Sequence, residues 1–161
     1  MGYRIRIARE ADLPEILQIY DYARSFMAAN GNPNQWGKTN PPRETLEADI
    51  AEGNLYVAET NGEICGVFFF AVGEDPTYRE IFDGSWASEA PYGTIHRIAS
   101  RGSGGLFAAC VDFCLQKCSH LRIDTHEDNH IMQHVIGKAG FQRRGIIYIA
   151  DGTPRIAFER V

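Results

Sequence analysis

The sequence predicts a mixed α/β domain in which about seven strands and about four helices follow one another along the chain. Short alternating or apolar runs typical of strands are separated by longer stretches with apolar residues at helical spacing. An Asn-Gly pair at residues 61–62 lies between two strand-like runs, which is typical of a tight hairpin. The 161 residues are 44% hydrophobic and 23% charged, which fits a folded protein with its own core. We therefore expect residues 1–161 to form a single domain.

The chain is expected to begin with a strand and an amphipathic helix. Residues 3–8 alternate with period two, which predicts the strand. Residues 12–27 predict the helix, because Asp12, Pro14 and Glu15 suit a capping box at its start. One face of this helix should be buried, since its apolar residues keep helical spacing; they are Leu13, Ile16, Leu17, Tyr20, Ala23 and Met27.

Turn residues and changes in apolar period predict the remaining elements. Residues 73–92 show neither period, and we expect them to be irregular and rich in aromatic side chains. The other expected elements are, in order, a helix at 43–53 that Gly53 ends, strands at 54–60 and 63–72, a strand at 93–100, a helix at 106–118, a strand at 121–126, a helix at 129–139 and two strands within 141–161 joined at Asp151-Gly152.

Composition and charge limit the classes of function. The net charge of -5 argues against a nucleic-acid partner bound through a basic surface. The chain contains no run near the ~18 apolar residues of a membrane span, and its first residues lack the apolar segment of a signal peptide. We therefore expect a cytoplasmic protein with no membrane partner. Its four cysteines suit that compartment as free thiols; they are Cys65, Cys110, Cys114 and Cys118.

A possible zinc motif lies at residues 126–130, where His126, Glu127 and His130 match the pattern H-E-x-x-H. Zinc binding by this pattern needs both histidines on one helical face. Asp128 and Asn129 are residues that favour a helix start, so we expect His126 to lie before the helix. The spacing would then fail, and we interpret the match as a coincidence with no metal site.

The turn at residues 101–105, Arg-Gly-Ser-Gly-Gly, carries a stronger functional signal. It joins an expected strand to an expected helix, so backbone N–H groups and the helix dipole can together hold a phosphate or pyrophosphate. Arg101 can add positive charge. The spacing of a Walker A motif is absent, because no lysine follows the glycines.

The order of elements, this turn, and Asn129 followed by Gly140-Phe141 resemble the GNAT superfamily of acyl-CoA-dependent N-acetyltransferases. The resemblance extends over essentially the whole chain. It implies a central, mostly antiparallel, twisted sheet of about seven strands with about four helices on its two faces. It also implies acetyl-CoA as co-substrate, and no metal. The residues that it places at the cofactor are Ile98, Ala99, Arg101, Gly102, Ser103, Gly104, Gly105, Leu106 and Asn129.

Two features depart from the family pattern. The last small position of the turn is occupied by Leu106, and only Ser100 separates the strand from Arg101. Many members carry a tyrosine four residues before the Gly-Phe pair as the acid for the departing thiolate, and Ile136 stands there in this chain. The general acid is therefore unassigned.

Acetyl transfer to an amine needs a base, and His96 is our candidate. His96 alternates with Arg97 along the strand at 93–100, so one of the two should face the cleft beside the next strand. Asp124, at the end of that next strand, could act through a water molecule. The resemblance implies that a backbone N–H near Ile98 or Ala99 polarises the acyl carbonyl.

The acceptor is expected to bind between the long irregular loops, which tend to carry function in compact domains. Asp75 and Glu80 could attract a cationic amine, either of a small molecule or of a peptide. The aromatic candidates for lining this site are Trp36, Tyr78, Phe82 and Trp86.

Three functions remain open at this point. The leading one is an N-acetyltransferase that moves an acetyl group from acetyl-CoA to a primary amine in a ternary complex. The second is a non-catalytic acyl-CoA-binding or sensing module, which Ile136 and the short turn favour. The third is a zinc hydrolase, which would require stoichiometric metal. Exposed strand edges would also allow a homodimer.

Overall fold

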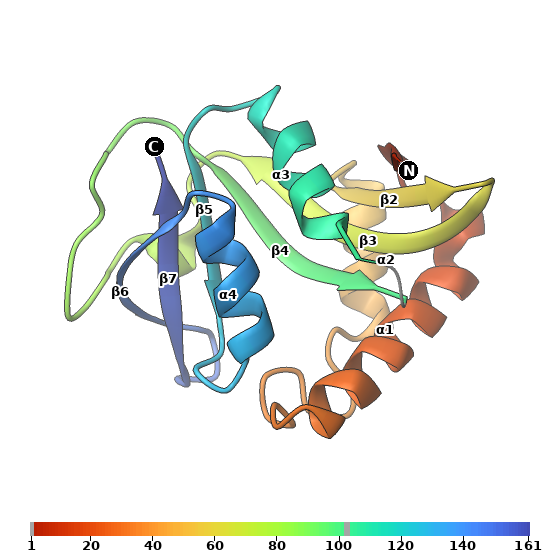
Figure 1. Ribbon diagram of the computed structural model, residues 1–161, viewed down its shortest axis with the longest axis horizontal. Helices are drawn as coiled ribbons and strands as arrows, with labels where there is room; N and C mark the ends of the chain where they lie inside the picture. The colour runs from red at the N-terminus through yellow and green to blue at the C-terminus, as the bar shows by residue number, and fades with distance from the viewer. Residues whose placement is uncertain (1, 102–103) are drawn as a thin grey trace.

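The computed structural model describes residues 2–101 and 104–161, which contain a seven-stranded sheet with helices on both faces (Figure 1). The strand order is β1-β2-β3-β4-β5-β7-β6. The strands are β1 (Arg4–Ile7), β2 (Leu55–Thr60), β3 (Glu63–Val72), β4 (Gly93–Ser100), β5 (Leu121–Thr125), β6 (Gln142–Tyr148) and β7 (Pro154–Arg160). The helices are α1 (Leu13–Ala29), α2 (Arg43–Ala51), α3 (Leu106–Leu115) and α4 (His130–Lys138), with short 3-10 segments at Glu10–Asp12 and Pro76–Tyr78. The predicted fold class is confirmed.

Two apolar clusters hold the helices against opposite faces of the sheet. On one face, Phe107 of α3 and Ile136 of α4 pack with side chains of β3, β4 and β5. On the other face, Ile16 of α1 and Leu46 of α2 pack with side chains of β2 and β3. Burial of each such side chain contributes roughly 1.5–3 kcal/mol. In Figure 1, α3 and α4 accordingly lie in front of the sheet, and α1 and α2 lie behind it.

Asp12 is the N-cap residue of α1, as predicted, but the predicted capping box is wrong, because the Asp12 side chain makes no capping hydrogen bond. Asp12 closes the 3-10 segment, and α1 begins one residue later. Its carboxylate accepts hydrogen bonds from the Arg6 guanidinium at 2.8 and 3.0 Å and from the Arg9 N–H at 2.8 Å. Charge-assisted hydrogen bonds are about twice as strong as neutral ones, so the guanidinium outcompetes the helix amides for this carboxylate.

The predicted tight hairpin between β2 and β3 is confirmed. Asn61 has φ 54° and Gly62 has φ 80°, the left-handed values that a type I′ turn requires at both central positions. Thr60 and Glu63 pair directly on either side of the turn. All four cysteines are free, as predicted, and Cys110 and Cys114 are buried. None of the described helices combines the length and the apolar character that a bilayer crossing needs.

The sheet opens between β4 and β5, its only parallel neighbours. These strands pair only at Gly93–Leu121 and Thr94–Arg122 and then diverge. Beyond this point β4 contains a bulge, because Phe69 pairs with His96 and Val67 pairs with Ala99, so that two β4 residues oppose one on β3. The bulge bends β4 away from β5, and the chain that lines the resulting gap carries the candidate site.

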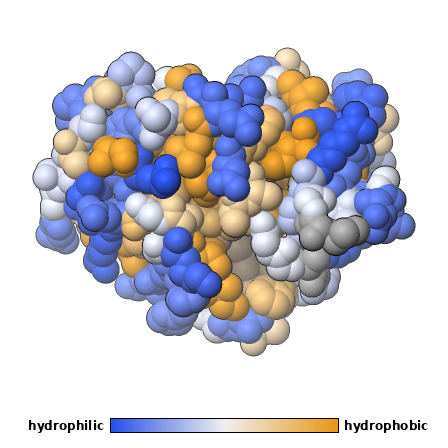
Figure 2. Space-filling view, turned by 45° about the horizontal axis from the view of Figure 1, so that its top comes forward, coloured by the Kyte–Doolittle hydropathy of each residue, from blue (hydrophilic) through white to orange (hydrophobic). Residues whose placement is uncertain are grey.

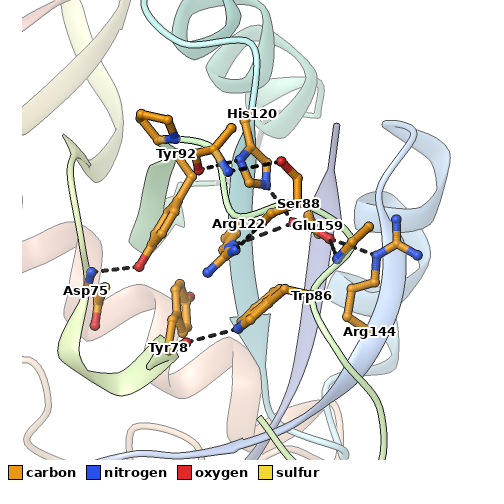
Figure 3. A network of polar contacts seen from close by, with 12 residues as sticks. Asp75, Tyr78, Trp86, Ser88, Tyr92, His120, Arg122, Arg144 and Glu159 are labelled. Carbon is orange, nitrogen blue, oxygen red and sulfur yellow. Dashed lines mark hydrogen bonds and ion pairs between the residues drawn. The ribbon is translucent and has the colours of Figure 1, made fainter. Parts of the chain in front are cut away.

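The closed end of the gap is held by a buried ionic network (Figure 3). Glu159 of β7 is 1% exposed. Its carboxylate accepts hydrogen bonds from His120 Nε2 at 2.6 Å, from Arg144 Nε at 2.9 Å and from the Ala87 N–H at 2.8 Å. Ala87 lies in the irregular segment 73–92, so this network ties that segment to the sheet.

Replacement of Glu159 should destabilise the fold strongly. Glu159→Gln leaves buried cationic donors without a counter-charge, which typically costs about 3–5 kcal/mol. Burial disfavours the charged carboxylate, but the three donors outweigh burial and lower the carboxyl pKa of Glu159. The contribution of Glu159 is therefore present at neutral pH and lost as pH falls below the ordinary glutamate value of 4.5.

Urea unfolding at several pH values measures this prediction. Glu63→Gln, the same change at an exposed position of β3, is the matched control and should alter the free energy of unfolding by less than about 0.5 kcal/mol. Equal losses in the two variants would show that the Glu159 network does not hold the segment.

Candidate functional site

A cleft of 590 Å³ occupies the gap between β4 and β5. Two smaller cavities of 170 and 420 Å³ adjoin it and continue along β4 to the start of α3. Ile98 and Met132 line all three spaces. Figure 2 shows a hollow on this side of the molecule, bordered by hydrophobic surface and flanked by hydrophilic surface. Of the predicted site residues, the cleft brings together Trp36, His96, Ile98, Asp124 and Asn129.

His96 lies between two carboxylates in the cleft. Its Nε2 is 2.7 Å from Asp75 Oδ2, and its Nδ1 is 3.8 Å from Asp124 Oδ1. Burial raises the carboxyl pKa of Asp75, but hydrogen bonds from His96 and Thr77 outweigh burial and lower it to about 2. Asp75 is thus ionised at neutral pH and can accept a proton only from Nε2; in the tautomer that donates from Nε2, Nδ1 is the acceptor nitrogen of the imidazole.

The second carboxylate is held by a buried tyrosine. Tyr78 is 1% exposed, and its hydroxyl donates to Asp124 Oδ1 at 2.6 Å. Burial and the adjacent Asp124 charge raise the pKa of Tyr78 well above 10. Tyr78 therefore stays protonated and fixes the Asp124 carboxylate beside His96. Asp75, which we expected to attract an amine directly, instead contacts the histidine, and Glu80 is exposed outside the cleft.

The bulge brings Arg97 into the cleft beside His96, although strict alternation predicted only one of them there. Arg97 has φ 51°, a left-handed value that is uncommon for a residue with a side chain. Its carbonyl accepts the Tyr20 hydroxyl at 2.6 Å, and its guanidinium donates to Asp49 Oδ2 at 2.8 and 3.1 Å. The guanidinium also lies 4.7 Å from the centre of the Phe69 ring. These contacts hold the bulge in one conformation.

Gln35, which no sequence pattern singled out, connects the loop after α1 to the far side of the cleft. Gln35 Oε1 accepts from Asn32 Nδ2 at 2.9 Å and from Asn129 Nδ2 at 3.0 Å. The Gln35 carbonyl accepts from Arg155 of β7 at 3.0 Å. An irregular loop gives no periodic signal, so its sequence could not show which partner Gln35 would reach. Asn129 was predicted correctly as the N-cap of α4, and its Oδ1 accepts the Met132 N–H at 3.0 Å.

The cofactor-side residues form the 420 Å³ cavity at the start of α3. Ile98, Ala99, Gly104, Gly105 and Leu106 line it. Gly105 has φ 85°, and a Cβ at either glycine would meet no heavy atom within 4 Å among the described residues. The Cβ positions of these two glycines therefore face open space, and no side chain of theirs covers the start of α3. Gly102 and Ser103, also predicted here, lie outside the described residues.

Arg101 does not line these cavities. Its side chain is exposed, and Nη2 donates to the Ile64 carbonyl of β3 at 3.1 Å. Its backbone N–H continues the β3 pairing by donating to the Cys65 carbonyl at 2.8 Å. The sequence placed Arg101 in the turn, but the strand pairing extends one residue further and directs it toward β3.

Of the four aromatic candidates for acceptor binding, the cleft includes only Trp36. Tyr78 lies behind Asp124, where its hydroxyl is already bonded. Phe82 is 45% exposed, forms a bridge with Ile146 at the β6 edge and lies outside the cleft. Trp86 lines a separate cavity, and its indole N–H donates to the Tyr78 carbonyl at 2.9 Å. Aromatic composition alone could not distinguish these packing roles from binding.

The structure also shows where the histidines of the H-E-x-x-H motif lie. The helix begins at His130, so His126 precedes it, as predicted. Within residues 2–101 and 104–161, no group of three or more His, Cys, Asp or Glu side chains is arranged to hold a metal ion. Ile136, at the usual tyrosine position, is fully buried in the core.

Solved structures of GNAT-family acetyltransferases share this fold. The chain is similar to a GNAT-family acetyltransferase from Streptococcus agalactiae, with a TM-score of 0.91 and 28% identity over 100% of this chain and 96% of that one. A ribosomal-protein-alanine N-acetyltransferase from Brucella melitensis gives 0.62 and 20% over 98% and 99% of the two chains. The aminoglycoside acetyltransferase AAC(6')-Ib, in complex with coenzyme A and kanamycin, gives 0.67 and 19% over 99% and 95%. Another structure of AAC(6')-Ib contains acetyl-CoA.

The predicted resemblance to the GNAT superfamily is thereby confirmed at the level of structure. No family model matches the sequence, and no curated protein matches it.

The anchoring of the bulge can be tested by removing one hydroxyl. Tyr20→Phe should lower the free energy of unfolding by about 1–3 kcal/mol, because the buried Arg97 carbonyl loses its donor. Tyr56→Phe is the matched control, since the Tyr56 hydroxyl has no hydrogen-bond partner among the described residues. Denaturant unfolding of both variants measures the difference. A Tyr20→Phe variant as stable as Tyr56→Phe would contradict the role assigned to this contact.

Proposed function

We propose that the protein is an N-acetyltransferase that transfers the acetyl group of acetyl-CoA directly to a primary amine of a small molecule or peptide. One observation carries this proposal: a cleft containing a histidine between two carboxylates is continuous with a groove that leads to an open helix start. The similarity to acetyltransferases, including a complex with an aminoglycoside and coenzyme A, supports the same function.

The groove suits a coenzyme A thioester in shape and chemistry. Ile98 and Ala99 lie on the part of β4 that has left β5, so their backbone is available for a pantetheine arm. Gly104 and Gly105 place no side chain over the start of α3, whose backbone N–H groups would bind the pyrophosphate. Phe26 and Ile131 add apolar walls to the groove. Asn129 lines the passage between groove and cleft.

His96 is the proposed general base. Its Nδ1 is free to accept a proton from the amine, while Asp75 holds the ring through Nε2. An acceptor ammonium between Nδ1 and Asp124 would contact both, since these groups lie 3.8 Å apart. Asp124 would bind the cation and His96 would take its proton, so the neutral amine forms at the place of attack. The bound thioester supplies the activated acetyl group.

The charge of the cleft favours a cationic acceptor. Its lining contains four carboxylates, Asp49, Glu52, Asp75 and Asp124, against two guanidiniums, Arg97 and Arg155. Arg97 is already paired with Asp49. Trp36 adds an aromatic face suited to a cation or to the apolar part of the acceptor. The protonation of the leaving thiolate has no assigned side chain: Tyr78 is committed to Asp124, and Ile136 cannot donate.

A non-catalytic acyl-CoA-binding module is the second candidate. Two observations favour it, the burial of Ile136 at the position of the usual acid and the orientation of Arg101 toward β3. Such a module would bind the thioester and release no thiol with any amine.

Calorimetry with acetyl-CoA, followed by thiol release in an amine panel, tests the proposed function. We expect saturable heat with acetyl-CoA and faster thiol release with at least one cationic amine. Gly105→Ala should weaken binding, because it strains a left-handed position and adds a methyl group at the groove. Gly152→Ala is the matched control, with the same φ of 85° in the turn after β6. Binding without turnover would favour the sensing module, and absence of heat would overturn both.

Substitution of His96 tests the base. His96→Gln should lower kcat/KM by roughly 10²–10⁴ and remove the rising limb of its pH profile, because His96 is the only histidine paired with Asp124 among the described residues. Asp75→Asn should give a smaller loss, since it removes only the group that orients the ring. His134→Gln changes an exposed histidine of α4 outside the cleft and should match wild type. An unchanged rate and pH profile in His96→Gln would assign the proton to another acceptor.

A further inference from the structure

A separate cavity of 410 Å³ lies in the segment between β3 and β4, and it shares no lining residue with the His96 cleft. Its walls are aromatic, with Tyr78, Trp86 and Tyr92, and its floor is Arg122 of β5. Glu74 and Glu89 lie at its rim. Its volume falls in the range of small-molecule sites.

Arg122 is a buried cation with an incomplete set of partners. Its residue is 3% exposed, and its guanidinium lies between two aromatic rings, 3.9 Å from the centre of Trp86 and 4.0 Å from the centre of Tyr92 (Figure 3). Nη2 donates to the Ser88 carbonyl at 2.7 Å. Among the described residues, Nε has no hydrogen-bond partner and Nη1 has none either. Nε is shielded from solvent and faces Glu159, so Nη1 is the donor of this guanidinium that remains for a ligand.

The nearest counter-charge, Glu159, forms a long ion pair with Arg122 and is shared with other groups. Glu159 Oε2 is 3.6 Å from Arg122 Nε, beyond hydrogen-bond distance. The same carboxylate already accepts from His120 and Arg144 at 2.6 and 2.9 Å. One carboxylate therefore faces two guanidiniums and an imidazole. Arg122 is thus paired with Glu159 only at 3.6 Å, and an anion at its guanidinium would supply a second counter-charge.

We propose that this cavity binds a small monocarboxylate with an apolar body. The carboxylate would accept from Nη1 of Arg122, whose planar donors match carboxylate geometry. The apolar body would lie against Tyr78 and Tyr92. At the rim, Glu74 is paired with Arg79, and Glu89 is the remaining carboxylate, which disfavours anions of higher charge and so favours a monocarboxylate over phosphate. Binding at this site needs neither coenzyme A nor an amine.

Trp86 provides the readout. The chain has two tryptophans, so Trp36→Phe leaves Trp86 as the only one. Titration of this variant with cyclohexanecarboxylate should give a saturable change in Trp86 emission, because the ligand would contact the guanidinium stacked on that ring. Cyclohexanecarboxamide, its neutral counterpart, and inorganic phosphate should bind at least about tenfold more weakly. An equal response to the amide, tighter binding of phosphate, or no saturable response to the carboxylate would each overturn the proposal.

Variants in the same background locate the site. Arg122→Lys keeps the charge but loses the planar donors, and should weaken binding at least about tenfold. If this variant fails to fold, Ala90→Phe provides the test of the site, because Ala90 is an exposed lining residue and a larger side chain there would fill the cavity. Glu89→Gln removes a rim charge and should tighten binding a few-fold, whereas Glu80→Gln makes the same change outside the cavity and should have no effect. Binding that persists in Ala90→Phe would place the carboxylate elsewhere and overturn the proposal.

Discussion

The site depends on one departure from regular structure, the separation of β4 from β5 after only two paired positions. A continuous sheet would satisfy every backbone group of β4 and leave no space between the strands. The bulge at Arg97 bends β4, and this conformation is unfavourable by itself because φ is positive at a residue with a side chain. Tyr20, Asp49 and Phe69 offset that cost with a hydrogen bond, an ion pair and a cation–π contact. The packing of α1 and α2 on this face therefore maintains the opening.

The bulge also explains how two neighbouring residues can both reach the cleft. In a regular strand, His96 and Arg97 would point to opposite faces. With Arg97 in a left-handed conformation, the alternation is interrupted, and both side chains line the cleft. Arg97 then neutralises Asp49, while His96 lies between Asp75 and Asp124. The surplus of carboxylates is thereby concentrated around the imidazole, where a cationic amine would lose its proton.

Local sequence signals predicted the fold well, because each depends on the residue itself. Asn61-Gly62 supplies the two positive φ values of its turn, and Asn129 caps α4 with its own side chain. His96 and Asp124 were placed at the cleft for the same reason, since strand ends and polar residues are visible locally, and both line it. The capping box at Asp12 does not form, because the guanidinium of Arg6, in another element, binds the Asp12 carboxylate. The bulge at Arg97, the contacts of Gln35 and the position of Tyr78 depend on partners from distant segments, and no local pattern encodes them.

The segment 73–92 shows why these distant contacts matter. It carries Asp75, which contacts His96, and Tyr78, which donates a hydrogen bond to Asp124. The segment therefore positions both carboxylates beside the imidazole. An irregular segment could not hold these positions by backbone pairing alone. Its anchor is the Glu159 network at the closed end of the sheet, where Ala87 donates to the carboxylate and Ser88 accepts from Arg122. The charged groups of that network are buried, so they cost desolvation free energy, and what they provide is a specific arrangement. The closed end of the gap thus determines the geometry of the open end, although no residue of the network lines the cleft.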